Sequence, residues 1–184
     1  FIKKELHPTS VMIWGGIGPN GFSTPLLYFD GHVNAETYIK ALKENFIFEN
    51  IERILGRRYI WQQDRASPHR ASETLQFLST RILIIFDWPT YSPDLSLIEQ
   101  VWEYMKKKIS GRKFQNEREL FHNLSQIWNK IPNEMLNNYT SSFWARCKVS
   151  EKYQGESINR KWKEVKEIHD SYRKIDSVTK FFQN

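Results

Sequence analysis

The first quarter of the chain alternates short apolar runs with residues that favour turns. Positions 11–14 read Val-Met-Ile-Trp, and a second apolar run, Leu-Leu-Tyr-Phe, occupies positions 26–29. The stretch between them is rich in glycine and also holds Pro19 and Asn20. Two apolar runs on either side of such a turn predict an antiparallel hairpin.

Apolar positions at helical spacing follow this hairpin. Asn34 belongs to the residue types favoured at a helix N-cap. The apolar residues after it recur at spacings of one, three and four, which is one face of an amphipathic helix: Tyr38, Ile39, Leu42 and Phe46. We therefore expect one helix that buries this face.

A second pair of apolar runs flanks a further helical pattern. Residues 59–61 predict a strand, and helical spacing returns over 69–79 through Ala71, Leu75 and Leu78. Every position of 82–86 is apolar, which is typical of a strand covered on both faces. A strand, a helix and a buried strand in succession predict a parallel pair inside a layered α/β fold.

The next predicted helix has a recognisable start. Ser92 is a candidate N-cap, Pro93 suits the first helical position, and Asp94 suits the positive end of the helix. The apolar stripe of this helix runs through Leu95, Ile98, Val101, Trp102, Met105 and Ile109.

The C-terminal half reads as helical. Residues 117–131 hold apolar positions in helical register, and after Gly155 the composition shifts to charges of both signs. Residues 159–174 keep only a thin apolar stripe, which is typical of an exposed or partner-packed helix. We expect an α/β core over 8–158 and a charged helical tail over 159–184.

Composition narrows the class of protein. Of the 184 residues, 40% are hydrophobic and 15% aromatic, which favours a packed globule over disorder. No apolar run approaches the length of a membrane span, and the first residues lack the apolar segment of a signal peptide. The single cysteine, Cys147, excludes a disulfide framework and a thiolate zinc site. We therefore expect a protein that is neither secreted nor held in a membrane.

The charge balance points to a polyanionic partner. Lysine and arginine number 27 against 21 aspartates and glutamates, which gives a net charge of +6 and suits nucleic acid. A cationic run that could meet phosphates continues the helix after its apolar stripe: Lys106, Lys107, Lys108, Arg112 and Lys113. Taken alone, such a run is more often a solvated face.

Two carboxylates stand at structured positions. Asp64 ends a predicted strand, where parallel α/β sheets place their ligand sites, and Glu99 lies at the edge of the apolar stripe described above. Two converging carboxylates are tolerated around a divalent cation, and Mg²⁺ prefers such oxygen ligands. By spacing alone, an aspartate after a strand is more often a turn residue, and a helical glutamate more often faces water.

Three blocks of sequence carry a more specific signal. They are residues 10–16 (Ser-Val-Met-Ile-Trp-Gly-Gly), residues 61–64 (Trp-Gln-Gln-Asp) with His69, and residues 88–102, which include Trp-Pro, Tyr-Ser-Pro-Asp-Leu and Ile-Glu-Gln-Val-Trp. Together they resemble the mariner superfamily of DDE transposases, in the branch whose third acid is glutamate. Members of that branch place 34 residues between the second and third acids, as do Asp64 and Glu99.

This resemblance implies an RNase H-like fold, a mixed sheet flanked by helices, and two-metal phosphoryl transfer with Mg²⁺ or Mn²⁺. Asp64 matches the second catalytic and metal-binding acid, Glu99 matches the third, and His69 matches a supporting histidine. The resemblance further implies DNA as the partner, both transposon ends and target, a possible homodimer, and a nuclear location in a eukaryote or a cytoplasmic one otherwise. Lys106, Lys107 and Lys108 would then lie beside the scissile strand, and Arg112 and Lys113 would also bind DNA.

Departures from the family pattern lower the expected activity. The family's first aspartate lies on a central strand upstream of position 11, and its helix-turn-helix region lies further upstream. Neither Glu5 nor Asp30 stands at a matching position. Arg65 replaces the usual asparagine after the second acid, and Ser96-Leu97 replaces the usual Asn-Pro before the third. We expect an RNase H-like core that lacks its first strand and is inactive as this fragment.

Other functions remain as alternatives. A domesticated module would keep the basic surface, bind nucleic acid and have lost catalysis. A nuclease of another RNase H-like family would cleave RNA–DNA hybrids, although the sequence blocks favour the transposase. Nothing in the spacing or the charge suggests a two-carboxylate glycosidase.

Overall fold

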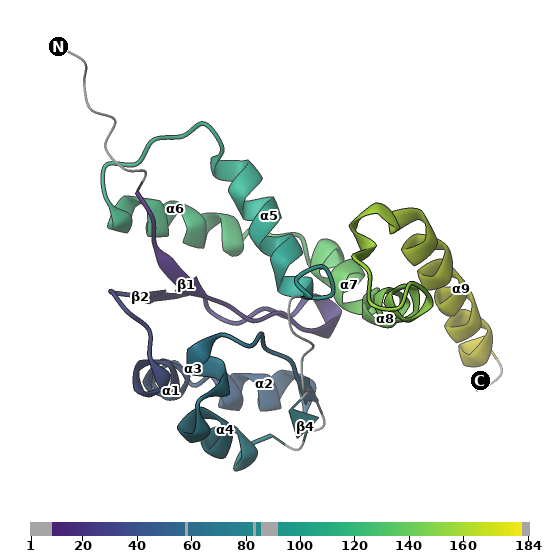
Figure 1. The fold of residues 1–184 in the computed structure, drawn as a ribbon, viewed down its shortest axis with the longest axis horizontal. Coiled ribbons are helices and arrows are strands. Elements are labelled where there is room, and N and C mark those ends of the chain that lie inside the picture. The colour runs from purple at the N-terminus through teal and green to yellow at the C-terminus, as the bar shows by residue number, and fades with distance from the viewer. Residues whose placement is uncertain (1–8, 58, 83, 86–91, 182–184) are drawn as a thin grey trace. The chain divides into compact units, whose positions relative to one another are not determined.

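The computed structural model describes residues 9–57, 59–82, 84–85 and 92–181 (Figure 1). The side chains of 84–85, 159 and 173–181 are outside that description, as are Glu5, Leu83, Phe86, Trp88, Pro89 and Tyr91, which the sequence analysis used.

The chain divides into two compact units. The sheet unit comprises residues 1–16, 23–90 and 103–131. The helical unit comprises residues 17–22, 91–102 and 132–184. The proposed boundary between a core over 8–158 and a tail over 159–184 remains a prediction.

The expected hairpin forms in the sheet unit. Strand β1 (Met12–Trp14) pairs antiparallel with β2 (Leu27–Phe29). At its mouth the Gly16 N–H donates to the Thr24 hydroxyl at 2.8 Å, and the Thr24 N–H donates to the Gly16 carbonyl at 2.9 Å. Helix α6 (Glu117–Trp128) lies on one side of the hairpin, and the helices that lie between residues 35 and 79 are on the other (Figure 1).

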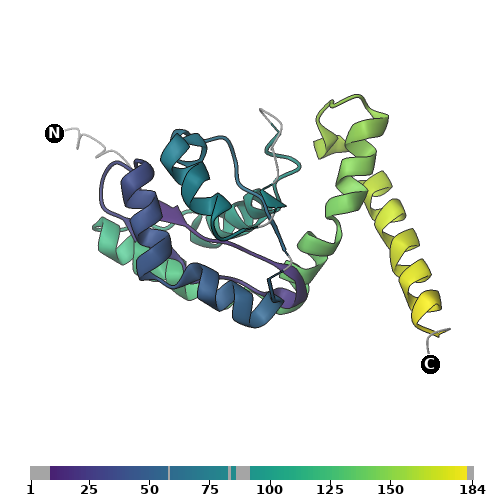
Figure 2. The same cartoon turned by 90° about the horizontal axis from the view of Figure 1, so that it is seen from below.

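The helix after the hairpin is shorter than expected. Asn34 caps α1 (Ala35–Glu44) in a capping box with Thr37, as predicted, and Tyr38 and Leu42 are buried. Phe46 is a correction, because it adopts a left-handed conformation (φ 50°) and is 63% exposed. The chain changes direction between the two helices (Figure 2), and a second helix, α2 (Ile47–Leu55), buries Ile47, Phe48 and Ile51 in addition to the buried residues of α1.

The second pair of strands is parallel, as predicted. β3 (Ile60–Trp61) pairs with β4 (Ile84–Ile85). The single helix expected between them is instead two helices, α3 (Ser67–Arg70) and α4 (Ser72–Ser79), because Ala71 is extended (ψ 142°). On α4, Leu78 is fully buried whereas Leu75 is exposed.

The described strands form two separate pairs, β1–β2 and β3–β4, rather than one continuous sheet. Side chains connect the pairs. The rings of Trp14 on β1 and Trp61 on β3 are stacked, with their centroids 6.3 Å apart, and Trp14 also meets the edge of Tyr38 on α1. The side-chain core of the sheet unit is therefore continuous between the two strand pairs, although no backbone hydrogen bonds join them in the described residues.

Helix α5 (Leu97–Ile109) begins later than the sequence predicted. Residues 92–96 form turns, in which the Leu95 N–H donates to the Ser92 carbonyl and the Ser96 N–H donates to the Pro93 carbonyl. The expectation that Ser92 caps this helix and Pro93 begins it was wrong, because Ser92 opens a turn before it. The stripe itself was correct at its centre, since Val101 and Met105 are buried.

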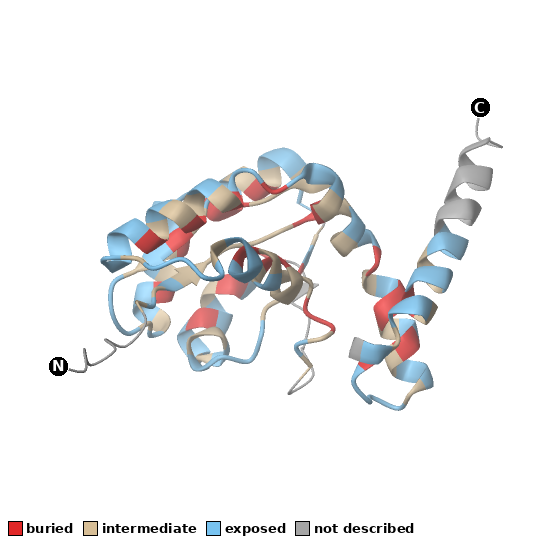
Figure 3. Cartoon of the chain, turned by 90° about the horizontal axis from the view of Figure 1, so that it is seen from above, coloured by how far each residue is buried: buried red, intermediate tan, exposed pale blue. Residues whose placement is uncertain are grey.

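Three further helices build the helical unit: α7 (Asn133–Ser141), α8 (Phe143–Lys152) and α9 (Trp162–Phe181). Two short 3₁₀ turns, η1 (Pro19–Gly21) and η2 (Ile158–Arg160), pack against α7 and α8 respectively. The buried residues of these helices, which are red in Figure 3, include Leu136 on α7, Val149 on α8 and Val165 on α9. No helix in the described part of the chain is long and apolar enough to cross a membrane.

Candidate active site

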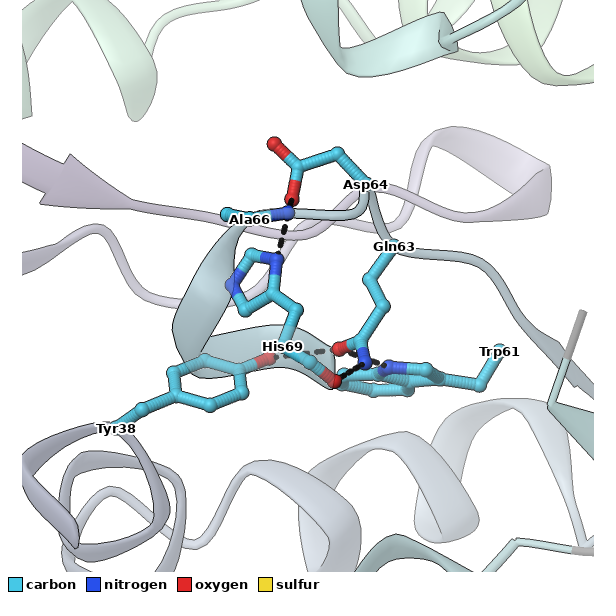
Figure 4. Close-up of polar contacts among 6 residues, drawn as sticks. All are labelled: Tyr38, Trp61, Gln63, Asp64, Ala66 and His69. Atoms are coloured by element: carbon cyan, nitrogen blue, oxygen red, sulfur yellow. Dashed lines mark hydrogen bonds and ion pairs between the residues drawn. The ribbon is translucent and has the colours of Figure 1, made fainter. Parts of the chain in front are cut away.

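Asp64 lies just after the C-terminal end of β3, on the loop that leads into α3 (Figure 4). Its Oδ1 accepts a hydrogen bond from the backbone N–H of Ala66 at 3.0 Å and lies 2.5 Å from Nδ1 of His69. Ala66 precedes α3 and His69 lies within it, so this short helix fixes both partners of the carboxylate. The structure thus brings together two of the residues that the sequence singled out.

The Asp64 carboxyl is held in its ionised form. Its pKa is lowered mainly by the hydrogen bond from His69 and further by the Ala66 N–H, while partial burial opposes the shift. Because an ionised carboxylate only accepts hydrogen bonds, Nδ1 of His69 carries the proton between them.

The second oxygen of Asp64, Oδ2, has no hydrogen-bond partner among the described residues, and the side chain is 61% exposed. In Figure 4 this oxygen points away from His69. An ionised, accessible carboxylate oxygen fits a hard divalent cation.

His69 is itself held from two sides. Its ring packs against the ring of Tyr38 with their centroids 4.6 Å apart, and its backbone carbonyl accepts a hydrogen bond from Nε2 of Gln63 at 2.9 Å. The His69 side chain is mostly buried, in contrast to the Asp64 side chain that it contacts. The supporting role expected of His69 therefore has a geometric basis.

Gln63 connects the loop to the core. Its Oε1 accepts hydrogen bonds from the Tyr38 hydroxyl and from the Trp61 indole N–H, each at 3.1 Å. Burial raises the pKa of the Tyr38 hydroxyl, so this group remains a donor. One amide thus links α1, β3 and α3 beneath the Asp64 carboxylate (Figure 4). In the sequence, Gln63 carries no signal beyond its place in the Trp-Gln-Gln-Asp block.

Glu99 lies in the first turn of α5 and belongs to the helical unit, whereas Asp64 belongs to the sheet unit. Glu99 is half-buried, at the edge of the stripe formed by Val101 and Met105, as its helical position predicted. Among the described residues, no group of three or more histidine, cysteine, aspartate or glutamate side chains forms a metal-binding cluster. The pairing of Asp64 with Glu99 remains a prediction.

The cationic run is exposed along its whole length. Lys106 forms an ion pair with Glu103 at 3.0 Å, Lys108 lies over the ring of Tyr104, and Arg112 lies over the ring of Phe114. Lys107 and Lys113 make no ion pair within the described ranges. Exposed cations of this kind are available to phosphates, and they equally suit a solvated face.

Comparisons with known proteins identify relatives of this chain. A family model described as DDE superfamily endonuclease matches residues 2–121. The Tcb2 transposable-element transposase of Caenorhabditis briggsae is 29% identical over 140 residues, which cover 76% of this chain and 50% of the relative. The chain therefore spans about half the length of that relative.

Solved structures share the fold. The Mos1 transposase paired-end complex with left transposon end aligns with a TM-score of 0.68 at 17% identity, over 76% of this chain and 42% of that one. The Mos1 transposase catalytic domain solved with raltegravir and Mg aligns with a TM-score of 0.64 at 18% identity, over 76% of this chain and 73% of that one. The predicted RNase H-like α/β fold with a helical C-terminal region is thereby confirmed.

Proposed function

The chain belongs to the DDE superfamily endonuclease family, and from this premise we propose that it is part of the catalytic domain of a transposase that cleaves and joins DNA strands. The observation that carries the proposal is the Asp64 carboxylate, ionised, accessible on one oxygen and fixed by His69. The position of Asp64 at the carboxyl end of a parallel strand supports the same role.

Asp64 and Glu99 are the residues that would hold Mg²⁺ or Mn²⁺. Both are carboxylates, which such hard cations prefer, and the Mos1 catalytic domain that shares this fold was solved with Mg. When bound, metals of this kind activate a water or hydroxyl nucleophile and stabilise the leaving oxygen of the phosphodiester. His69 keeps the proton on Nδ1 and orients the Asp64 carboxylate, so that Oδ2 stays ionised.

DNA would be bound through the exposed cationic run of Lys106, Lys107, Lys108, Arg112 and Lys113. Lys107 and Lys113, without ion pairs in the described part of the chain, are the most available of these side chains. Release of counterions from DNA on binding makes such contacts strongly salt-dependent. The same run would serve a nucleic-acid-binding module without catalysis, so cleavage, rather than binding, distinguishes the two functions.

We expect a polypeptide of these 184 residues, taken alone, to bind DNA without cleaving it, because it supplies two carboxylates where the family resemblance implies three. The test is a strand-cleavage assay with Mg²⁺ or Mn²⁺ on duplexes that carry mariner-type terminal repeats. Binding without cleavage supports the inactive fragment. Cleavage that Asp64→Asn abolishes and Asp30→Asn leaves intact would show that these residues suffice. Cleavage of RNA–DNA hybrids in preference to duplex DNA would contradict the transposase assignment.

A further inference from the structure

The helical unit contains a cavity of about 410 Å³ that lies apart from the residues assigned above to metal binding. Its lining comes from α5, α7, α8 and α9 and includes Gln100, Asn138, Arg146, Trp162, Lys166 and His169. Three of its lining side chains are basic and none is acidic. A cavity with this charge has the composition of an anion-binding site.

Arg146 on α8 is the unusual residue of this cavity, because it is only 1% exposed. Its Nε donates to the Ser142 hydroxyl and its Nη1 donates to the Asp94 backbone carbonyl, each at 3.1 Å. The guanidinium carbon lies 4.3 Å from the centroid of the Trp162 ring. Nη2 has no hydrogen-bond partner among the described residues.

The charge of Arg146 is only partly compensated. No carboxylate in the described ranges lies within ion-pairing distance of it, and the Asp94 carboxylate accepts the Ile158 N–H through Oδ2 at 2.7 Å. Burial lowers the pKa of Arg146 to about 10, and the nearby Tyr139 and Asp94 side chains oppose this shift. The guanidinium therefore stays charged at neutral pH, in a place where a buried cation ordinarily has an anionic partner.

Other lining groups complete a site for an anion on an apolar wall. Lys166 lies exposed on α9 and makes no ion pair within the part of the chain described. Nε2 of His169, one turn further along α9, lies 3.0 Å from the Ser141 hydroxyl. Asn138 and Gln100 bring neutral amides, and the Trp162 ring with Val165 forms the apolar wall. A phosphate attached to a sugar fits both features, because the phosphate is an anion for the basic groups and the sugar can pack against the apolar wall.

We propose that this cavity binds a phosphate group of the DNA backbone, with Arg146 at its base and Lys166 at its rim. Arg146 would donate a hydrogen bond from Nη2 to a phosphate oxygen, while Trp162 and Val165 pack against the sugar. The identity of the phosphate's carrier rests on the proposed function, whereas the affinity for phosphate rests on the cavity alone. A purely structural Arg146, linking α8 to residues 92–96, would explain its two hydrogen bonds but would predict no phosphate binding.

The first experiment uses inorganic phosphate at constant ionic strength with the 184-residue protein. The indole N–H signal of Trp162, identified in NMR spectra by its loss in Trp162→Phe, reports on the cavity. We expect a saturable shift in the millimolar range, weakened several-fold in Lys166→Gln. Lys163→Gln is the matched control, because Lys163 is an exposed lysine of the same helix that does not line the cavity. An unmoved Trp162 signal, or equal binding by Lys166→Gln and the wild type, would overturn the proposal.

The second experiment measures DNA binding by fluorescence anisotropy with a labelled duplex in EDTA, across a range of salt. We expect Lys166→Gln to weaken binding and to reduce the slope of log K against log salt by about one unit. An equal effect of Lys163→Gln, or an effect of Lys166→Gln on phosphate but not on DNA, would overturn the assignment to DNA. Because metal is absent and Asp64 is not involved, this outcome is separate from any failure of the proposed catalytic role.

Discussion

Replacing His69 with alanine tests whether this histidine keeps the Asp64 carboxylate ionised. The hydrogen bond from His69 is the largest cause of the lowered pKa of Asp64, and the Ala66 N–H is a smaller one. In His69→Ala the larger contribution disappears while the backbone contribution remains. We therefore expect the pKa of Asp64 to rise toward the ordinary value of an aspartate without passing it.

The magnitude follows from the exposure of the pair. A hydrogen bond to a charged group contributes about 1.5–3 kcal/mol to stability. Because the Asp64 side chain is 61% exposed, solvent screening reduces this contribution to about 1 kcal/mol. The expected rise in the pKa of Asp64 in His69→Ala therefore reflects the loss of about 1 kcal/mol of stabilisation of the ionised carboxylate.

The same shift fixes the sign of the pH dependence. A carboxyl whose pKa is lower in the folded protein stabilises the fold above its unfolded pKa, and this contribution is lost as the pH falls through the folded pKa. The wild type should therefore lose more stability than His69→Ala as the pH falls below the ordinary aspartate pKa of 3.8 and through the lower folded pKa of Asp64. Above that window the variant should be the less stable of the two.

The assay is a carbon-13 NMR titration of the aspartate carboxyls in metal-free protein, with the Asp64 signal identified by its absence in Asp64→Asn. His122→Ala is the control, because His122 is an exposed histidine that is distant from Asp64 in the sequence. Nε2 of His122 lies 2.9 Å from the amide nitrogen of Gln126. If the pKa of Asp64 were the same in His69→Ala, His122→Ala and the wild type, the orienting role of His69 would be refuted.

Two further variants test packing within the sheet unit. Gln63→Leu should lower the free energy of unfolding by about 2–4 kcal/mol in urea titrations, because the buried Tyr38 hydroxyl and the Trp61 indole N–H both lose their acceptor; a loss below about 0.5 kcal/mol would mean that the amide is not a structural link. Gly15→Ala should cost about 1–3 kcal/mol, since a Cβ there would lie 2.7 Å from the Trp128 ring, and an unchanged midpoint would show that this ring can move aside.

Local patterns predicted most of the secondary structure, and the failures have local causes. The hairpin and the parallel pair follow from apolar runs bounded by turn residues, which is information contained in a few positions. Phe46 was wrongly assigned to the buried face of α1 because it continues the helical spacing of that helix. The backbone turns at Phe46, and the apolar residues that directly follow it are buried on α2. Spacing does not encode such a change of direction.

The start of α5 shows a second limit. Ser92 and Pro93 carry every local signal of a helix N-terminus, yet the chain forms turns until Leu97. Those turns place Asp94 so that its carboxylate accepts a hydrogen bond from the Ile158 N–H. The Asp94 backbone carbonyl accepts another from Nη1 of Arg146. These long-range contacts favour the turns over an earlier helix start, and no local pattern contains them.

The candidate site was partly visible in the sequence. Asp64 and His69 were marked by the resemblance to mariner-type transposases, and the structure places them in contact. The linking role of Gln63 was not predicted, because a glutamine at a strand end carries no signal until its hydrogen-bond partners on α1 and α3 are known. The burial of Arg146 could not be predicted from the sequence, because an arginine in a helical pattern is ordinarily assigned to the surface.

Binding of Mn²⁺ to the 184-residue protein, followed by the electron paramagnetic resonance signal of the free ion, tests the central claim most directly. If Asp64 and Glu99 contribute to one metal site, Asp64→Asn and Glu99→Gln should each weaken binding by about tenfold or more, ~1.4 kcal/mol. Asp30→Asn and Glu103→Gln, which remove exposed carboxylates outside the site, should leave the affinity unchanged. An affinity that depends on Asp64 but is the same in Glu99→Gln as in the wild type would contradict the account.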